Sequence, residues 1–198
     1  GPVVFTGAQR SSDRGSSDAA QNLVCSAHLA GKSDLGEGVI CMHGSASDDF
    51  CYAHRGTKVR KMHTSRRDTF QSINAKPLLE ISSNGQIKKL SEYRKASGNT
   101  TADTKFEDKI TLLKAYPGAS SEIIDYYVDK KFKGLVIEAT GLGHVPLTWG
   151  DSIQRAIGEG VAIVFAAQTI YGRLNPYVYE PARKMKALGV IYAEDMLP

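Results

Sequence analysis

The sequence predicts an α/β protein in which a truncated doubly wound parallel sheet domain is followed by a smaller parallel α/β domain. Short apolar runs alternate with stretches of helical periodicity along most of the chain, an order typical of parallel sheets covered by helices. A polar stretch at residues 91–108 interrupts this alternation. We therefore place the first domain at 1–90, a linker at 91–108 and a second, incomplete domain at 109–198.

The first domain is expected to begin with a strand, a helix and a second strand. Residues 3–6 are apolar and end at a glycine, and residues 18–30 have helical periodicity after a serine-rich stretch that offers Ser16, Ser17 or Asp18 as a cap. The predicted buried face of this helix is apolar and consists of Ala20, Leu23, Val24 and Ala27.

Shorter elements are expected in the rest of the first domain. Strands are predicted at 38–42 and 50–54, and residues 61–74 are expected to hold a loop with at most one helical turn. Apolar runs at 78–81 and 86–90 flank Asn84-Gly85. Because this dipeptide suits a tight turn with positive φ, it predicts a β-hairpin.

The second domain has the pattern of a β-α-β-α-β series. Strands are expected at 110–115, 135–139, 161–166 and 190–192, and helices at 121–131, 151–157 and 181–188. The first of these helices should turn Ile123, Ile124, Tyr127 and Val128 inward. The chain opens on a buried type of strand and closes on residues resembling the start of a helix, so we expect a piece cut at both ends.

Composition excludes several classes of protein. At 198 residues, with 41% apolar and 23% charged residues, the chain is typical of a globular protein with a sizeable core. No apolar run approaches the roughly 20 residues of a membrane span, and no signal segment opens the chain. Three cysteines are too few for a disulfide framework. We therefore expect a cytoplasmic location and no membrane contact.

The net charge is mild, and the possible metal ligands are poorly spaced. A net charge of +4 is low for a dedicated nucleic-acid binder.

The pairs Cys41-x-His43 and Cys51-x-x-His54 contain residue types that bind zinc. However, Cys41 and His43 would lie on one face of a strand but be spread along it, and the sequence contains no C-x-x-C pair. We expect buried thiols and loop histidines, with no metal.

Residues 6–18 lie between a strand and a helix. In open parallel sheets, ligands bind beyond the carboxyl ends of the strands, where helix N-termini offer free N–H groups. This segment is therefore either a ligand-binding loop or a plain loop with a good cap.

Residues 55–68 carry much of the positive charge. Lys61 is crowded in sequence by Lys58, Arg60, Arg66 and Arg67. Neighbouring positive charges make a lysine less basic, and a lysine that loses its proton near neutral pH can activate a hydroxyl nucleophile. The alternatives are a solvated basic loop and a patch for RNA phosphates.

Two loops of the second domain follow predicted strands. Gly141-Leu142-Gly143-His144 is similar to a dinucleotide-binding loop, but Pro146 stands where the third glycine belongs. We expect a tight turn there. Residues 168–173 also follow a strand, and either form an ordinary turn or point into the same cleft.

Four blocks of sequence, taken together, resemble the L-asparaginase family. VVFTGAQRSSDRGSSDAAQNL is similar to the stretch that follows the family's Gly-Thr-Asp-Thr motif, and RGTKVRKMHTSRRDTFQSIN is similar to its lysine segment. EATGLGHVP and QTIYGRLNPYVYE resemble the version found in the D-type subunit of the archaeal glutamyl-tRNA(Gln) amidotransferases. The resemblance covers essentially the whole chain and implies an asparaginase-type fold.

The resemblance also implies roles for individual residues. The family's catalytic set contains two threonines, an aspartate and a lysine, and Lys61 matches the lysine. Ala8 and Gln9 match positions near the substrate amide, and His144 matches a position that reaches a cleft or a neighbouring subunit. The threonine motifs do not occur in this sequence, so we expect these residues alone to lack turnover.

The resemblance finally implies partners. An asparaginase-like homodimer would release ammonia from glutamine or asparagine. A tRNA-binding partner subunit would use ATP and Mg to convert Glu-tRNA(Gln) to Gln-tRNA(Gln), and this chain itself would bind no cofactor. The alternatives are a free cytoplasmic L-asparaginase, and a non-catalytic fragment or RNA-binding module.

Overall fold

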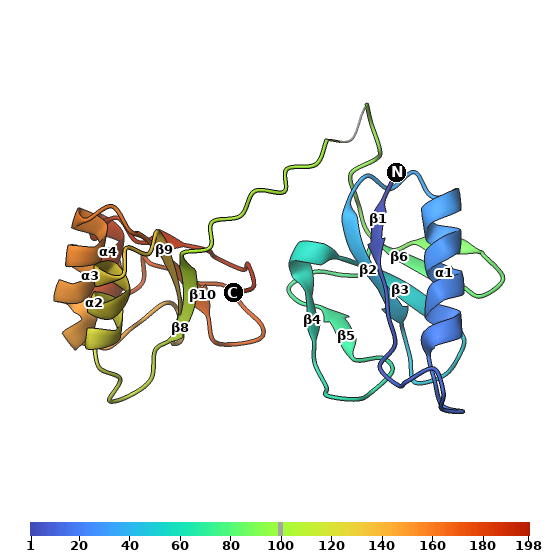
Figure 1. Cartoon of the computed structure of the whole chain (residues 1–198), viewed down its shortest axis with the longest axis horizontal. Helices are drawn as coiled ribbons and strands as arrows, with labels where there is room; N and C mark the ends of the chain where they lie inside the picture. The colour runs from blue at the N-terminus through green and yellow to red at the C-terminus, as the bar shows by residue number, and fades with distance from the viewer. Residues whose placement is uncertain (99–100) are drawn as a thin grey trace. The chain divides into compact units, whose positions relative to one another are not determined.

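The chain folds into two compact units, each with its own hydrophobic core (Figure 1). The structure is a computed structural model and describes residues 1–98 and 101–198. Unit 1 comprises residues 1–101 and unit 2 comprises residues 102–198. Asn99 and Thr100, at the centre of the predicted linker, lie outside the described residues.

Unit 1 is built on a five-stranded sheet. Its strands, in spatial order, are β1 (Val3–Phe5), β2 (Gly38–His43), β3 (Phe50–Arg55), β6 (Leu79–Ser82) and β7 (Ile87–Lys89). β1 and β2 are parallel, whereas the other neighbouring pairs are antiparallel. The sheet of this unit is therefore mixed, and the expected parallel arrangement holds between β1 and β2. The connection 44–49 between β2 and β3 is too short for a parallel crossover, which needs about a dozen residues.

A second, small sheet in unit 1 corrects another expectation. The 3₁₀ helix η1 (Gly56–Lys58) leads into β4 (Val59–Lys61), which pairs antiparallel with β5 (Phe70–Ser72). Residues 62–69 thus form the expected loop, which closes a β-hairpin, whereas the helical turn is absent from residues 61–74. The hairpin predicted around Asn84-Gly85 is confirmed between β6 and β7, and Gly85 has φ +84°.

Helix α1 (Ala19–Lys32) packs on the sheet with a different face from the one predicted. Its buried residues are Asn22, Cys25, Ser26 and Leu29, while Leu23 and Val24 are 63% and 43% exposed. Ala20 and Ala27 are exposed as well. The apolar pattern failed because Asn22 can be buried at little cost: its amide is hydrogen-bonded to Gly7, Asp18 and His43.

Unit 2 confirms the predicted parallel series. The sheet has the order β11-β10-β9-β8, and every neighbouring pair is parallel. Along the chain, its elements are β8 (Ile110–Lys114), α2 (Glu122–Asp129), β9 (Gly134–Ala139), η2 (Leu147–Trp149), α3 (Gly150–Gly158), β10 (Ala162–Ala167), α4 (Glu180–Leu188) and β11 (Ile191–Tyr192).

The core of unit 2 lies between this sheet and its helices. Phe165, Ile137 and Trp149 are almost fully buried there, and the Trp149 indole N–H donates to the Ala119 carbonyl at 2.9 Å. Ile124 and Val128 of α2 point inward as expected, but Ile123 is 39% exposed. The inward stripe of this short helix is therefore narrower than the sequence suggested.

The first part of the predicted linker is attached to unit 1. Tyr93 packs against the unit 1 core, the Arg94 carbonyl accepts the Gly36 N–H at 2.7 Å, and the Ala96 N–H donates to the Asp34 carbonyl. These contacts continue the unit beyond residue 90. In the described part of the chain, no helix is both long and apolar enough to cross a membrane.

Candidate active site

The loop between β1 and α1, residues 7–18, is called the substrate loop below. Asp18 is 1% exposed and accepts the backbone N–H groups of Gln9 at 2.9 Å and Arg10 at 3.0 Å. Burial disfavours the charged carboxylate, but the hydrogen bonds from Arg10 and Gln9 outweigh it and lower the pKa of Asp18. Although Asp18 occupies the N-cap position, its carboxylate fixes the loop rather than the helix.

Ala8 and Gln9 lie in the part of the loop that Asp18 anchors. Ala8 is exposed and Gln9 is half-buried. Within the described residues, the Gln9 side-chain oxygen Oε1 is buried and has no hydrogen-bond partner. A buried acceptor without a donor costs about 1–3 kcal/mol. A donor supplied by a substrate or by another segment of protein would remove this cost.

The connection between β2 and β3 lies beside the substrate loop. His43, the last residue of β2, is fully buried in its side chain. Its Nδ1 lies 2.6 Å from Asn22 Oδ1, and its Nε2 lies 2.9 Å from Asp48 Oδ1. The hydrogen bond to the His43 ring lowers the pKa of Asp48. His43 therefore links the start of α1 to residues 44–49.

The β4–β5 hairpin, residues 59–72, is called the lysine hairpin. Lys61 is exposed and ends β4, opposite Phe70. The hairpin tip is closed by Thr69, which is 1% exposed; its hydroxyl accepts the His63 N–H at 2.7 Å and donates to the His63 carbonyl. A shallow cavity of about 350 Å³ is lined by residues 61–64.

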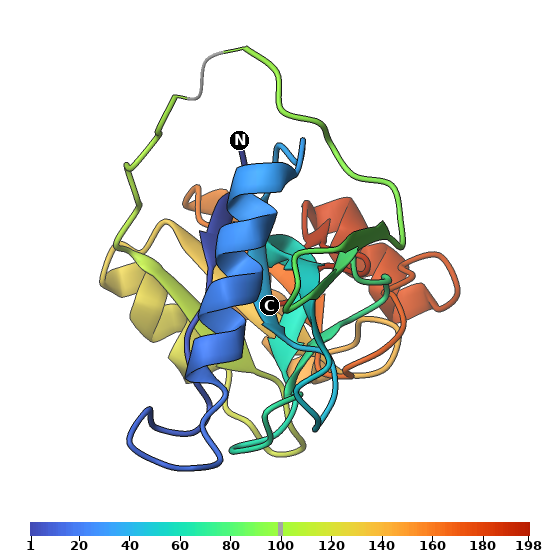
Figure 2. The same ribbon diagram turned by 90° about the vertical axis from the view of Figure 1, so that its right-hand side faces the viewer.

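The substrate loop and the tip of the lysine hairpin lie at the same end of unit 1 (Figures 1 and 2). This end is where β1 and β2 terminate, so it is the edge at which parallel strands usually bind ligands. The structure thus brings the Ala8–Gln9 segment and the Lys61 hairpin to one edge, as a ligand-binding loop beside a reactive lysine would require.

The positive charge around Lys61 is partly neutralised. Arg66 makes two hydrogen bonds with the Asp68 carboxylate, at 2.9 and 2.7 Å. Arg67 pairs with Asp48 at 2.8 Å and donates to the Ala46 carbonyl. Arg66 and Arg67 therefore both have carboxylate partners, which weakens the case for a patch for RNA phosphates.

His144 lies in unit 2, whereas Lys61 lies in unit 1. It is half-buried, and its ring lies 5.3 Å from the Tyr179 ring, centroid to centroid. The predicted tight turn before it is confirmed: Gly141 and Gly143 have φ +53° and +114°, and a Cβ on Gly143 would meet the Tyr192 ring at 2.6 Å. In the neighbouring loop, Gln168 donates to the backbone carbonyls of Ala115 and Glu138.

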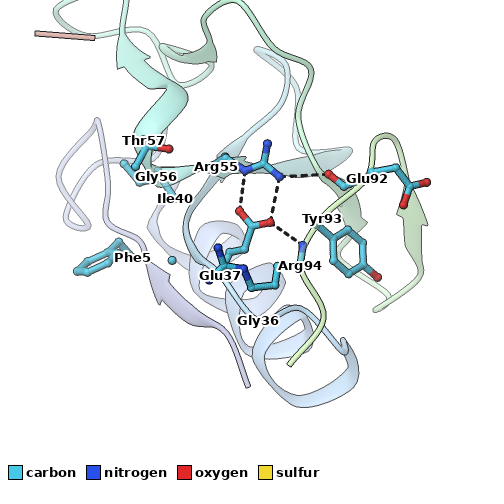
Figure 3. A pocket seen from close by; sticks show the side chains of 11 residues that line it. Phe5, Gly36, Glu37, Ile40, Arg55, Gly56, Thr57, Glu92, Tyr93 and Arg94 are labelled. Atoms are coloured by element: carbon cyan, nitrogen blue, oxygen red, sulfur yellow. Dashed lines mark hydrogen bonds and ion pairs between the residues drawn. The ribbon is translucent and has the colours of Figure 1, made fainter. Parts of the chain in front are cut away.

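A larger cavity of about 1070 Å³ was not anticipated (Figure 3). Its lining comes from the start of β2, the end of β3 and residues 92–94, together with Phe5 of β1 and Ile40 of β2. Within it, Arg55 binds both oxygens of Glu37, at 2.6 and 2.9 Å, and the Arg94 N–H donates to Glu37 at 2.7 Å. Because its charges satisfy one another, we assign this ion pair to structure. The partners lie far apart in sequence, which is why no motif revealed them.

Comparison with known proteins gives the class of this chain. Residues 1–94 match the family "Asparaginase, N-terminal", and residues 109–198 match the "Glutaminase/Asparaginase C-terminal domain". The thermostable L-asparaginase from Thermococcus kodakarensis has the same fold, with a TM-score of 0.85 and 25% identity over 98% of this chain and 57% of that one. The chain belongs to the asparaginase family, as its sequence blocks and asparaginase-type fold indicated.

Closer relatives are archaeal. The chain is 57% identical to the D-type subunit of the glutamyl-tRNA(Gln) amidotransferase of Pyrococcus abyssi and 56% identical to that of Pyrococcus furiosus. It is 51% identical to the corresponding subunit of Archaeoglobus fulgidus. These matches cover all of this chain, but only 45 to 47% of the relatives' length.

Proposed function

We propose that this chain is part of an amidotransferase subunit that releases ammonia from glutamine or asparagine in the cytoplasm. The observation that carries the proposal is the position of the substrate loop and the lysine hairpin at the same end of unit 1 (Figures 1 and 2). Membership of the asparaginase family supports amide hydrolysis. The names of the archaeal relatives support delivery of the ammonia to Glu-tRNA(Gln).

The proposed reaction is acyl transfer to a threonine supplied by another segment of the longer protein. Lys61 accepts the proton of the threonine hydroxyl, and the oxygen attacks the carbonyl carbon of the side-chain amide. The C–N bond then breaks, and the nitrogen leaves as ammonia after taking up a proton. Water hydrolyses the acyl-enzyme and restores the hydroxyl. Ala8 and Gln9 hold the substrate amide near Lys61.

The names of the relatives support a partner amidotransferase subunit and a Glu-tRNA(Gln) substrate, and we propose the following division of labour. A second subunit binds Glu-tRNA(Gln), activates its glutamate with ATP and Mg, and receives the ammonia. ATP and Mg then belong to that second subunit, while the asparaginase-like subunits pair as a homodimer. His144 lies at the cleft or at a subunit contact.

The test compares two lysines of the same segment in the full-length protein. Lys61→Met should lower ammonia release from glutamine by about 10²–10⁴-fold, the usual loss when a general base is removed. Lys58→Met is the matched control from the same segment and should leave hydrolysis within about twofold, since Lys58 has no role in the proposed reaction. Thermal melts check folding. Near-normal release by Lys61→Met would refute the assignment.

A second candidate is a free L-asparaginase, which the similarity to the Thermococcus kodakarensis enzyme favours. The two candidates differ in their dependence on tRNA. An amidotransferase subunit should release more ammonia when its partner subunit and Glu-tRNA(Gln) are present. A rate that is unchanged by both additions would favour the free asparaginase.

A further inference from the structure

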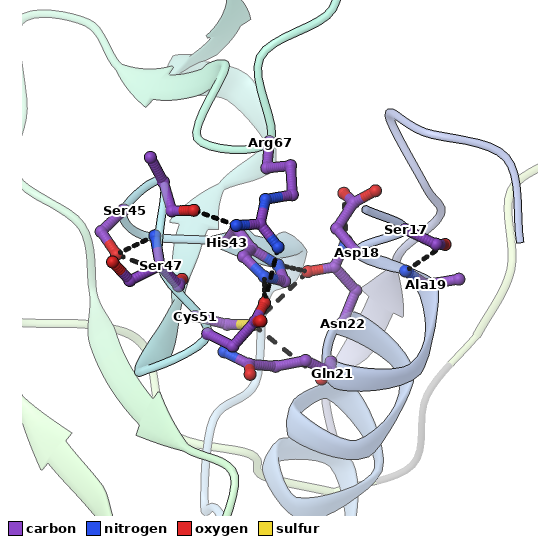
Figure 4. Close-up of polar contacts among 12 residues, drawn as sticks. Ser17, Asp18, Ala19, Gln21, Asn22, His43, Ser45, Ser47, Cys51 and Arg67 are labelled. Carbon is purple, nitrogen blue, oxygen red and sulfur yellow. Dashed lines mark hydrogen bonds and ion pairs between the residues drawn. The ribbon is translucent and has the colours of Figure 1, made fainter. Parts of the chain in front are cut away.

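We propose that a chain of five side chains positions the lysine hairpin against the substrate loop. The series runs through Arg67, Asp48, His43, Asn22 and Asp18. Figure 4 shows Arg67, His43, Asn22 and Asp18 of this series. Its members are positioning residues, and their role in catalysis rests on the function proposed above. Each link is a hydrogen bond or ion pair of 2.9 Å or less.

The need for such a connection follows from the sheet topology. β4 and β5 pair with each other in a sheet of their own, separate from the five-stranded sheet. Among the described residues, no strand ladder therefore fixes where the end of the hairpin bearing Lys61 lies. At the opposite end of the hairpin, His54 of β3 lies 2.8 Å from the Ser72 hydroxyl. At the Lys61 end, Arg67 takes this role.

The outer half of the chain joins the hairpin tip to the β2–β3 connection. Arg67 donates to Asp48 at 2.8 Å and to the Ala46 carbonyl, and its side chain is only 18% exposed. Asp48 is 64% exposed, but the same carboxylate oxygen also contacts His43 Nε2 at 2.9 Å. One carboxylate thus connects the hairpin tip to a fully buried ring.

In the inner half of the series, the donor and the acceptor of each hydrogen bond can be assigned. Asn22 Nδ2 donates to the Gly7 carbonyl at 2.9 Å and to Asp18 at 2.8 Å. These two acceptors place the amide oxygen of Asn22 toward His43, so His43 Nδ1 must be the donor in the 2.6 Å contact. The ring is held between two acceptors and has little freedom to rotate.

The series of five side chains ends on the backbone of the substrate loop. Asp18 receives the N–H groups of Gln9 and Arg10, next to Ala8. A shift at the hairpin tip therefore reaches the substrate loop through hydrogen-bonded groups, of which His43, Asn22 and Asp18 are buried. Small misplacements of reacting groups can lower a rate by as much as about 10²-fold. This series of contacts was not predicted from the sequence, because Arg67 lies in a run of basic residues and no local pattern distinguishes it from its neighbours.

The test uses two adjacent aspartates in the full-length protein with its partner subunit. Asp48→Ala removes the connecting carboxylate, and Asp49→Ala makes the same change at the exposed neighbour. Asp48→Ala should lower kcat for ammonia release about tenfold with little change in KM, because the base is displaced while substrate contacts persist. Asp49→Ala should match wild type. Asp48→Asn keeps an acceptor oxygen and should recover most of kcat.

A double variant tests whether the two ends act through one contact. Arg67→Met alone should resemble Asp48→Ala, and the combined variant should lose little more than either single variant. If the fold-losses in kcat of the two single variants multiplied in the combined variant, the proposal would be overturned. An unchanged kcat in Asp48→Ala would overturn it as well.

Hydrogen exchange separates this inference from the proposed function. If the wild-type protein releases no ammonia, the proposed function fails, yet the connection can still be measured. Asp48→Ala, but not Asp49→Ala, should speed exchange of the His63 and Arg66 amides and, to a smaller extent, of the Gln9 and Arg10 amides. Equal exchange in the two variants would overturn the connection.

Discussion

The two units bury different kinds of side chain. Among the described residues, the buried polar side chains of unit 1 are Asp18, Asn22, Ser26, His43, His54 and Thr69, whereas those of unit 2 are Glu138 and Ser152. Unit 2 has the larger apolar core, and several of its ion pairs lie at the surface of its helices. Two units of similar length therefore use different contacts for stability.

Unit 1 buries several polar side chains, whereas the interior of unit 2 is mainly apolar. Buried polar groups are tolerated only when they are hydrogen-bonded, and in unit 1 most of them hold loops at the edge where β1 and β2 end. Departures from local sequence rules gather at functional sites. The polar interior of unit 1 thus supports the proposal that the chemistry takes place there.

The largest expected effect is on the packing of unit 2. Phe165 is fully buried in β10, so Phe165→Ala should destabilise this unit by about 3–5 kcal/mol. Trp149, the only tryptophan of the sequence, reports on the same core, and its fluorescence during urea unfolding gives the measurement. Ile191→Ala, at a residue that is 55% exposed, is the control. An equal loss of amide protection in β2 would show that the two cores are not independent.

The next effect should distinguish the units by acid sensitivity. Burial lowers the pKa of His54 from 6.5 to about 4. As the pH falls from 6.5 to 4, the unfolded chain binds a proton that the folded chain does not. The free energy of unfolding of unit 1 should therefore fall by about 3 kcal/mol over this range. The described part of unit 2 has no buried histidine.

This acid effect can be assigned to one ring by substitution. His54→Gln should flatten the loss of stability between pH 6.5 and 4, whereas His28→Gln, at a half-buried histidine of α1, should leave it unchanged. Amide exchange in β3 at several pH values provides the measurement. If unit 2 lost as much stability as unit 1 over this range, the contrast between the two units would not hold.

The smallest effect concerns the surface of unit 2. Arg155 of α3 pairs with Asp125 and Asp129 of α2 and with Glu159, and its side chain is 40% exposed. Because solvent screens such pairs, Arg155→Ala should destabilise unit 2 far less than Phe165→Ala does, and the loss should shrink in high salt. Lys184→Ala, which removes one exposed pair with Glu180, is the control. A loss similar to that of Phe165→Ala would mean that surface pairs, rather than the apolar core, stabilise unit 2.

Local patterns in the sequence were enough for several features. The Asn84-Gly85 hairpin, the parallel series of unit 2 and the turn before His144 follow from turn residues and strand–helix alternation, which depend on neighbours in the chain. The membership of the asparaginase family was also visible in the sequence blocks. The roles assigned to Lys61, Ala8, Gln9 and His144 stay predictions.

Tertiary structure alone decided which residues face which others. The apolar pattern of α1 predicted the wrong face, because Asn22 is buried by partners that lie elsewhere in the sequence. The antiparallel pairing of β2 with β3 and the Glu37–Arg55 ion pair were also not predicted from the sequence. The hydrogen-bonded side chains from Arg67 to Asp18 join segments that are separated in sequence by α1, β2, β3 and β4. Such contacts depend on long-range pairing, and the periodicity of a single segment contains no information about its distant partners.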